Sequence, residues 1–259
     1  MQLSFQEPFR LMTRPLCLLS GRYDAAIIDL DGTMVDTMGD FVAAINLMLC
    51  DLGCAAVDRS VVTLRVGKGS ENLVNSILNC AADQSILAHE APENIAYFEP
   101  ALRLYQQHYR NINGQYAQVY PGVVGSLQAL HNAGLKLACL TNKPSAFARE
   151  LLKQKGLDVF FSHVFGGDSF ERKKPDPLPV FETCKALGTL PARTLMVGDS
   201  SNDAHAARAA GCPVLLVTYG YNHGEPIRSV DADGYIDLLG DASAQLESQL
   251  ASLTTDPAL

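Results

Sequence analysis

Two aspartates one residue apart follow a short apolar run near the start of this chain, and this pattern constrains the fold more than any other. The run Ala25-Ala26-Ile27-Ile28 predicts a buried strand, and Gly32 turns the chain just after Asp29 and Asp31. Because alternate residues of a strand share a face, the two carboxylates start out on one side. Buried together they repel each other unless a cation or a proton lies between them. The pattern indicates a metal site or a nucleophile beside an acid–base group; the alternative is a polar strand end whose aspartates make turn hydrogen bonds.

Two further apolar segments lead into polar residues in the same manner. Residues 135–140 lead into Thr141-Asn142-Lys143-Pro144, and residues 194–197 lead into Gly198-Asp199-Ser200-Ser201-Asn202-Asp203. Between these two segments, Lys173-Lys174-Pro175-Asp176-Pro177 opens a helical stretch. In open α/β sheets ligands bind beyond the carboxyl ends of the strands, so the endings predict one shared crevice.

This ordered set of segments resembles the four motifs of the haloacid dehalogenase-like hydrolase superfamily, over residues 25–240. The resemblance implies an α/β fold, with a Rossmann-like core built on a mainly parallel sheet. It implies that Asp29 is a nucleophile whose aspartyl-phosphate is then hydrolysed by water. Asp31 would protonate the leaving alkoxide and later take a proton from the attacking water. Thr141 would donate a hydrogen bond to a phosphoryl oxygen, and Lys174 would supply positive charge to the same oxygens.

The resemblance also implies a Mg²⁺ site made of Asp29, the backbone carbonyl of Asp31, and Asp199, since this ion prefers oxygen ligands. For Asp203 three interpretations remain: it binds the metal through water, it orients Lys174, or it is an aspartate favoured by the dipole at a helix N-terminus. Asn142 is expected to support these groups from outside the reacting set.

The carboxylate of Asp31 separates reaction types within the superfamily. By resemblance, members that release a halide lack a carboxylate at this position, because halide leaves without a proton. Members that cleave phosphonates also replace it. Its presence in this chain favours hydrolysis of a phosphate ester.

Helical patterns replace strand patterns after the first strand. Residues 41–49, 73–78 and 95–108 are apolar at helical spacing. They predict an inserted α-helical cap, where the superfamily carries one; the alternative is a helical part of one continuous core. The expected organisation is a catalytic core at 23–37 and 119–240 with the cap inserted at 38–118. A loosely ordered extension is expected at 1–22, with Met12 as an alternative start of translation. A C-terminal helix or tail is expected at 241–259.

A cation flanked by glycines precedes one of the cap helices, in Arg65-Val66-Gly67-Lys68-Gly69-Ser70. Backbone N–H groups at a helix start attract anions, and the loop lies where the superfamily places a specificity loop. Lys68, and after it Arg65, is therefore the candidate that binds the non-reacting end of the substrate. The alternative is a solvated loop at a helix start.

Two other segments narrow the resemblance. Tyr120-Pro121-Gly122-Val123, and the stretch from Tyr219 to Ile227 with the later residues 231–236, resemble phosphoglycolate phosphatases of the proteobacterial type. The implied reaction converts 2-phosphoglycolate to glycolate and phosphate. Alternatives are a phosphatase for another small phosphate, such as a sugar phosphate or pyrophosphate, and a related phosphomutase. A non-catalytic phosphate-binding module is disfavoured because Asp29 and Lys174 are both present.

Composition limits the partners. The 259 residues carry a formal net charge of −8, which disfavours nucleic acid and anionic membranes and leaves a small anionic phosphorylated metabolite. No stretch has the roughly 20 predominantly apolar residues of a membrane-spanning helix.

The seven cysteines form no close pair with nearby histidines, which favours reduced cysteines in a cytoplasmic protein over a zinc site or a disulfide framework. The pattern leaves monomer and dimer open.

Overall fold

The computed structural model describes residues 22–83 and 95–239, and its centre is a six-stranded sheet. Its strands, in chain order, are β1 (Ala25–Ile28), β4 (Lys136–Leu140), β5 (His163–Phe165), β6 (Thr194–Gly198), β7 (Val214–Val217) and β8 (Gly234–Ile236). All of their pairings are parallel, which confirms the predicted α/β class. The predictions for the N-terminal extension, for Met12 and for the C-terminal tail lie outside the described residues.

The strand order β5-β4-β1-β6-β7-β8 puts β1 in the middle of the sheet. From β1 the chain builds outward through β4 and β5, then returns to the other side of β1 with β6. Ile28 is thereby in register with Cys139 of β4 and Val197 of β6. Because the order reverses at β1, the carboxyl ends of β1, β4 and β6 lie side by side, where doubly wound sheets bind their ligands.

Helices cover both faces of the sheet, and alternate residues of β1 face them. Ala26 and Ile28 share a buried cluster with Leu127 and Leu151, whereas Ile27 packs on the opposite face. The apolar run of β1 reflects this burial on both sides. The helices are α6 (Val123–Asn132), α7 (Ser145–Gln154), α8 (Leu178–Leu187) and α9 (Ser201–Ala210), with short 3-10 turns at Asp158–Phe160, Pro191–Arg193 and Ile227–Ser229.

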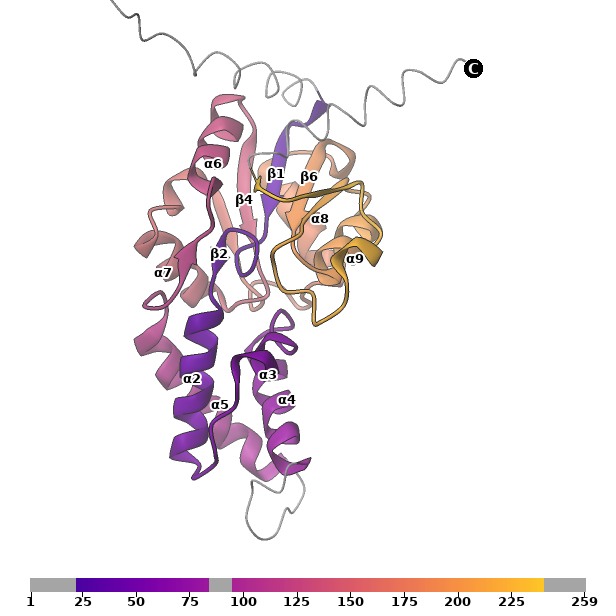
Figure 1. The fold of residues 1–259 in the computed structure, drawn as a ribbon. Helices are drawn as coiled ribbons and strands as arrows, with labels where there is room; N and C mark the ends of the chain where they lie inside the picture. The colour runs from indigo at the N-terminus through magenta and orange to yellow at the C-terminus, as the bar shows by residue number, and fades with distance from the viewer. Residues whose placement is uncertain (1–21, 84–94, 240–259) are drawn as a thin grey trace, which may run out of the picture.

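Four helices form a separate unit beyond one end of the sheet (Figure 1). They are α2 (Met38–Asp51), α3 (Arg59–Thr63), α4 (Ser70–Asp83) and α5 (Ile95–Ile112). Their buried side chains, among them Met48, Ile77 and Tyr105, make a hydrophobic cluster apart from the two clusters of the sheet. We call this unit the cap. None of the helices in the described part of the chain combines the length and apolar character needed to cross a membrane.

The two chain segments that join the cap to the sheet are held together. β2 (Val35–Asp36) pairs with β3 (Gln118–Val119) in a small antiparallel sheet, which is too short to leave a periodic pattern in the sequence. Beside it, the buried Asp40 accepts hydrogen bonds from the backbone N–H groups of Gly114 (2.6 Å) and Tyr116 (2.7 Å). One carboxylate at the start of α2 therefore fixes the segment by which the chain leaves the cap.

Replacing Asp40 is expected to lower the free energy of unfolding. Asp40→Ala removes two charge-assisted hydrogen bonds and leaves one buried and one partly buried N–H group without this acceptor, at a cost of roughly 2–4 kcal/mol. The matched control is Asp58→Ala, because Asp58 is exposed and makes no side-chain capping bond; its expected effect is within about 0.5 kcal/mol. Urea denaturation of both variants measures the difference, and equal stability would contradict the role given to Asp40.

Candidate active site

The carboxyl ends of β1, β4 and β6 open into one pocket beneath the cap. Asp29, Asp31, Thr141, Lys174 and Asp199 all line it. Side chains of the cap cover its other side, and the cavity volume is about 40 Å³. The sheet therefore brings together residues that lie up to 170 positions apart in the sequence (from 29 to 199).

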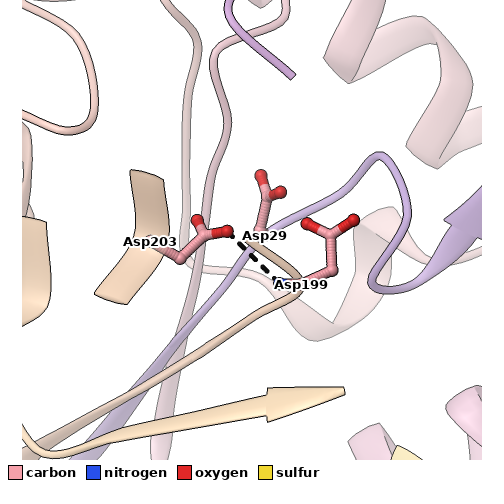
Figure 2. Close-up of side chains that lie close together, drawn as sticks. All are labelled: Asp29, Asp199 and Asp203. Atoms are coloured by element: carbon pink, nitrogen blue, oxygen red, sulfur yellow. Dashed lines mark hydrogen bonds between the residues drawn. The ribbon is translucent and has the colours of Figure 1, made fainter. Parts of the chain in front are cut away.

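Three carboxylates gather at the base of this pocket (Figure 2). Asp29, Asp199 and Asp203 each offer an oxygen, and these oxygens all lie within 4.8 Å of one another. The backbone N–H of Asp29 donates to Val197 at 2.9 Å, which continues the pairing of β1 with β6 and fixes where the side chain starts. All three residues are buried, so the negative charges are close together and poorly solvated.

Both oxygens of Asp203 already have partners within the protein. Its Oδ1 pairs with Lys174 Nζ at 2.6 Å, and its Oδ2 accepts from the Ser200 hydroxyl at 2.7 Å and from the N–H groups of Asp199 and Ser200 at 3.2 Å. Ser200 and Asp203 thereby form a capping box at the start of α9. Of the three interpretations of Asp203, the geometry supports the one in which it orients Lys174.

Lys174 is a buried cation held from three sides. Its Nζ lies 2.6 Å from Asp203, 2.9 Å from Asp29 Oδ1, and 2.7 Å from the carbonyl of Leu140. Burial alone would lower the pKa of Lys174, but the charges of Asp203 and Asp29 outweigh it and raise the pKa above its usual value. Lys174 is therefore fully charged at neutral pH and points into the acidic cluster.

The environments of Asp29 and Asp199 suit a bound cation. Burial raises the pKa of Asp29 to about 7, against the lowering effect of Lys174. Burial, with the neighbouring charges of Asp203 and Asp29, raises the pKa of Asp199 well above its usual value. Asp29 Oδ1 has the Lys174 ammonium as its partner at 2.9 Å, and the described residues give it no second one. A divalent ion with oxygen ligands would relieve both carboxylates.

Thr141 and Asn142 occupy the end of β4. Thr141 is 2% exposed, and its Oγ1 accepts from the backbone N–H of Lys143 at 3.2 Å. The Asn142 side chain donates to the carbonyl of Lys174 at 2.9 Å and to that of Gly67, in the cap loop, at 3.1 Å. Asn142 thus supports the backbone of Lys174 and ties the cap to the sheet.

Tyr221 is a site residue to which the sequence analysis assigned no role. Its backbone N–H donates to Asp199 Oδ2 at 2.6 Å, while its hydroxyl donates to Asp36 and accepts from the N–H groups of Thr37 (3.0 Å) and Met38 (3.2 Å). It therefore links a carboxylate of the acidic cluster to the segment where the chain enters the cap. The sequence singles out the loop that begins at Tyr219, after β7, but the spacing of its residues does not predict these contacts.

Gly32 allows the close approach on which this arrangement depends. Its φ is +84°, and an added Cβ would lie 1.9 Å from Asp199 Oδ2. Any side chain would therefore displace Asp199 as well as strain the backbone. The sequence predicts only a turn at Gly32, and the structure adds this steric requirement.

Lys143 is the second residue without a predicted role. It lines the pocket, with its Nζ 3.0 Å from Asp31 Oδ1 and 2.5 Å from the Tyr109 hydroxyl. Its side chain is 2% exposed. One signal was available, since residues two apart at a strand end share a face and Lys143 lies two positions after Thr141.

Lys68 and Arg65 do not line this pocket. Lys68 borders an open outer pocket with Glu71 and Lys173, and Arg65 donates to the carbonyl of Val61 at 2.7 Å. Of their loop, Val66, Gly67, Gly69 and Ser70 border the inner pocket. In this arrangement the loop contributes backbone and small groups, and its two cations lie elsewhere.

Comparison with known proteins agrees with this architecture. Residues 26–217 match the family model described as haloacid dehalogenase-like hydrolase. The phosphoglycolate phosphatase of Thiobacillus denitrificans is 39% identical over 219 residues, which cover 85% of this chain and 93% of that protein. The plasmid-encoded phosphoglycolate phosphatase of Cupriavidus necator is 41% identical over 215 residues, or 83% and 89% of the two chains.

Among solved structures, one described as a predicted phosphoglycolate phosphatase from Haemophilus somnus superposes with a TM-score of 0.80. It shares 32% sequence identity, and the match covers 90% of this chain and 99% of the other. The similarity therefore extends over the sheet and the cap together.

Proposed function

The chain belongs to the haloacid dehalogenase-like hydrolases, and from this membership we propose that it is a Mg²⁺-dependent phosphatase that hydrolyses 2-phosphoglycolate to glycolate and phosphate. The observation that carries the proposal is the shared pocket at the ends of β1, β4 and β6. It holds Asp29 and Lys174 in contact, with Asp31 beside them. The names of the relatives at 39% and 41% identity support the choice of substrate.

In the proposed reaction the Asp29 carboxylate attacks phosphorus, and the bond from phosphorus to the ester oxygen breaks. Asp31 protonates the departing alkoxide, then takes a proton from the water that hydrolyses the aspartyl-phosphate. Thr141 donates a hydrogen bond to a phosphoryl oxygen. Lys174, held in place by Asp203, offsets the negative charge of the phosphoryl oxygens in the transition state.

Asp29, Asp199 and the backbone carbonyl of Asp31 would hold the Mg²⁺ ion, an oxygen donor set that this ion prefers. Bound there, the ion would cancel negative charge on the nucleophile and on the phosphoryl group. The raised pKa values of Asp29 and Asp199 support this assignment, as does Asp29 Oδ1, whose one partner among the described residues is Lys174. Tyr221 would keep Asp199 oriented through its backbone N–H.

The direct test is phosphate release from a panel of substrates with Mg²⁺ present. The panel contains 2-phosphoglycolate, p-nitrophenyl phosphate, a hexose phosphate and pyrophosphate. The proposal predicts the highest kcat/KM for 2-phosphoglycolate. A hexose phosphate that is hydrolysed faster would reassign the substrate, and no release from any compound would favour a non-catalytic module.

Asp31→Asn tests the acid–base role by leaving group. We expect kcat/KM for an alkyl phosphate to fall roughly 10²-fold or more, the range of general acid catalysis. For p-nitrophenyl phosphate the loss is expected to be under about tenfold, because its anion leaves without a proton. Comparing kcat/KM isolates the steps up to loss of the leaving group; equal losses for the two esters would exclude Asp31 as the acid.

A further inference from the structure

The pocket contains a second buried cation besides Lys174. Lys143 comes from the loop after β4, its side chain is 2% exposed, and its Nζ lies 3.0 Å from Asp31 Oδ1. The proposed reaction has no step that uses it. A lysine is seldom buried unless it is paired; Asp31 is its charged partner, and the open question is what else its ammonium binds.

The surroundings of Lys143 leave part of its bonding capacity unused. Its ammonium carries three N–H donors, and the described residues supply two acceptors, Asp31 and the Tyr109 hydroxyl. The rings of Phe41 and Tyr109 lie 4.8 and 4.6 Å from Nζ and face the cation. One N–H therefore remains for a group that enters the pocket.

The cap supplies an apolar wall around this cation. Phe41, Tyr105, Tyr109 and Leu73 border the pocket from helices α2, α5 and α4. Against such an apolar wall a charged group of a ligand needs a partner of opposite charge, and an ion pair is stronger there than in water.

The geometry of 2-phosphoglycolate matches this position. In the proposed reaction its ester oxygen lies next to Asp31, which protonates it. The carboxylate carbon is two covalent bonds from that oxygen, and Lys143 is one hydrogen-bond length from Asp31. A substrate whose phosphoryl group sits on Asp29 would therefore carry its carboxylate toward Lys143.

We propose that Lys143, with the Tyr109 hydroxyl, binds the carboxylate of the substrate and makes the enzyme selective for short phosphorylated acids. This inference rests on the proposed function. It gives to Lys143 the role that the sequence predicted for Lys68, whose side chain borders the outer pocket. Because Tyr109 belongs to the cap and Lys143 to the sheet, the carboxylate would be enclosed when the two parts meet.

The test compares two esters that differ in the carboxylate, 2-phosphoglycolate and ethyl phosphate. Both release a poor alkoxide, so any damage to Asp31 affects them alike, and the ratio of their kcat/KM values reports recognition of the carboxylate. Lys143→Met is expected to lower this ratio roughly 10- to 100-fold, the worth of one charged hydrogen bond. Lys143→Arg should retain most of the ratio, and the control Lys68→Met should change it less than about threefold.

A binding measurement covers the case in which Lys143→Met is a poor catalyst for both esters. In an Asp29→Asn background, calorimetry compares the affinity for 2-phosphoglycolate with and without Lys143→Met, and the same factor is expected. Equal losses of kcat/KM for both esters, or unchanged affinity, would mean that Lys143 is only a partner of Asp31. A lower ratio of the two kcat/KM values in Lys68→Met would instead assign recognition of the carboxylate to Lys68. Failure of the parent enzyme to prefer 2-phosphoglycolate would instead overturn the proposed function.

Discussion

Asp29→Asn is expected to lower phosphate release from every monoester by roughly 10⁴-fold or more, the scale on which loss of a nucleophile acts. An amide cannot attack phosphorus. Among the described residues of the pocket, Asp203 is the other carboxylate paired with Lys174, and its oxygens already accept hydrogen bonds within the protein. The folded state should not suffer. Burial raises the pKa of Asp29 to about 7, so the charged form is destabilised in the fold and a neutral isostere removes that cost.

Two measurements separate chemistry from folding in this variant. Phosphate release gives the rate, and thermal unfolding without metal at pH 8 should give a Tm equal to or above that of the parent. Trapping with beryllium fluoride, which mimics a phosphoryl group on a carboxylate, should occur in the parent with Mg²⁺ and not in the variant. Turnover within tenfold of the parent would remove Asp29 from the nucleophile role.

Removal of metal is the second change with a large expected effect. EDTA should abolish hydrolysis of all substrates, and added Mg²⁺ should restore it. Ca²⁺ should restore little, since its longer bonds of about 2.3–2.6 Å and higher coordination number loosen the octahedral arrangement. Full activity after chelation would contradict the assignment of Asp29 and Asp199 as ligands.

The effect of Mg²⁺ on Tm measures metal binding at this site independently of catalysis. At about 100 times its Kd a bound ion adds about 2.7 kcal/mol, which corresponds to a rise in Tm of roughly 5–10 °C. In the proposed site the ion would bind the ionised carboxylate of Asp29, whose pKa is raised by burial to about 7. Protons therefore compete below that pH, and the rise caused by Mg²⁺ should be present at pH 8 and shrink at pH 5. An Asp199→Asn variant, the matched control, should show a smaller rise at both.

We expect the cap to shape selectivity and the sheet to carry the chemistry. Asp29, Thr141 and Asp199 follow strands of the core, whereas Phe41, Tyr105 and Tyr109 come from the cap. The two parts meet where Asn142 and Asn202 donate to the carbonyl of Gly67, at 3.1 and 3.2 Å. Substitutions in the cap should therefore alter the choice of substrate before they alter the reaction.

Local sequence was sufficient for the strand endings and the cap helices, whereas the fold class followed from the resemblance carried by the ordered motifs. An apolar run buried on both faces reads as a central strand, so 25–28 and 194–197 were placed where β1 and β6 lie. The helices expected in 41–49, 73–78 and 95–108 fall within α2, α4 and α5. These features depend on near neighbours, because periodicity and turn residues act over a few positions.

The pairing of side chains across the pocket needed the tertiary structure. Lys143 meets Tyr109 across 34 positions, and Tyr221 meets Thr37 across 184. Neither pair leaves a local pattern, since a hydrogen bond between distant residues depends on how cap and sheet dock. The same reason explains Lys68: its loop could be located from glycines and a helix start, but the direction of its side chain depends on packing against the core. The sequence by itself determined which groups the strands present, and the tertiary structure decided which cation enters the pocket, because only docking of the cap selects the charge that is enclosed.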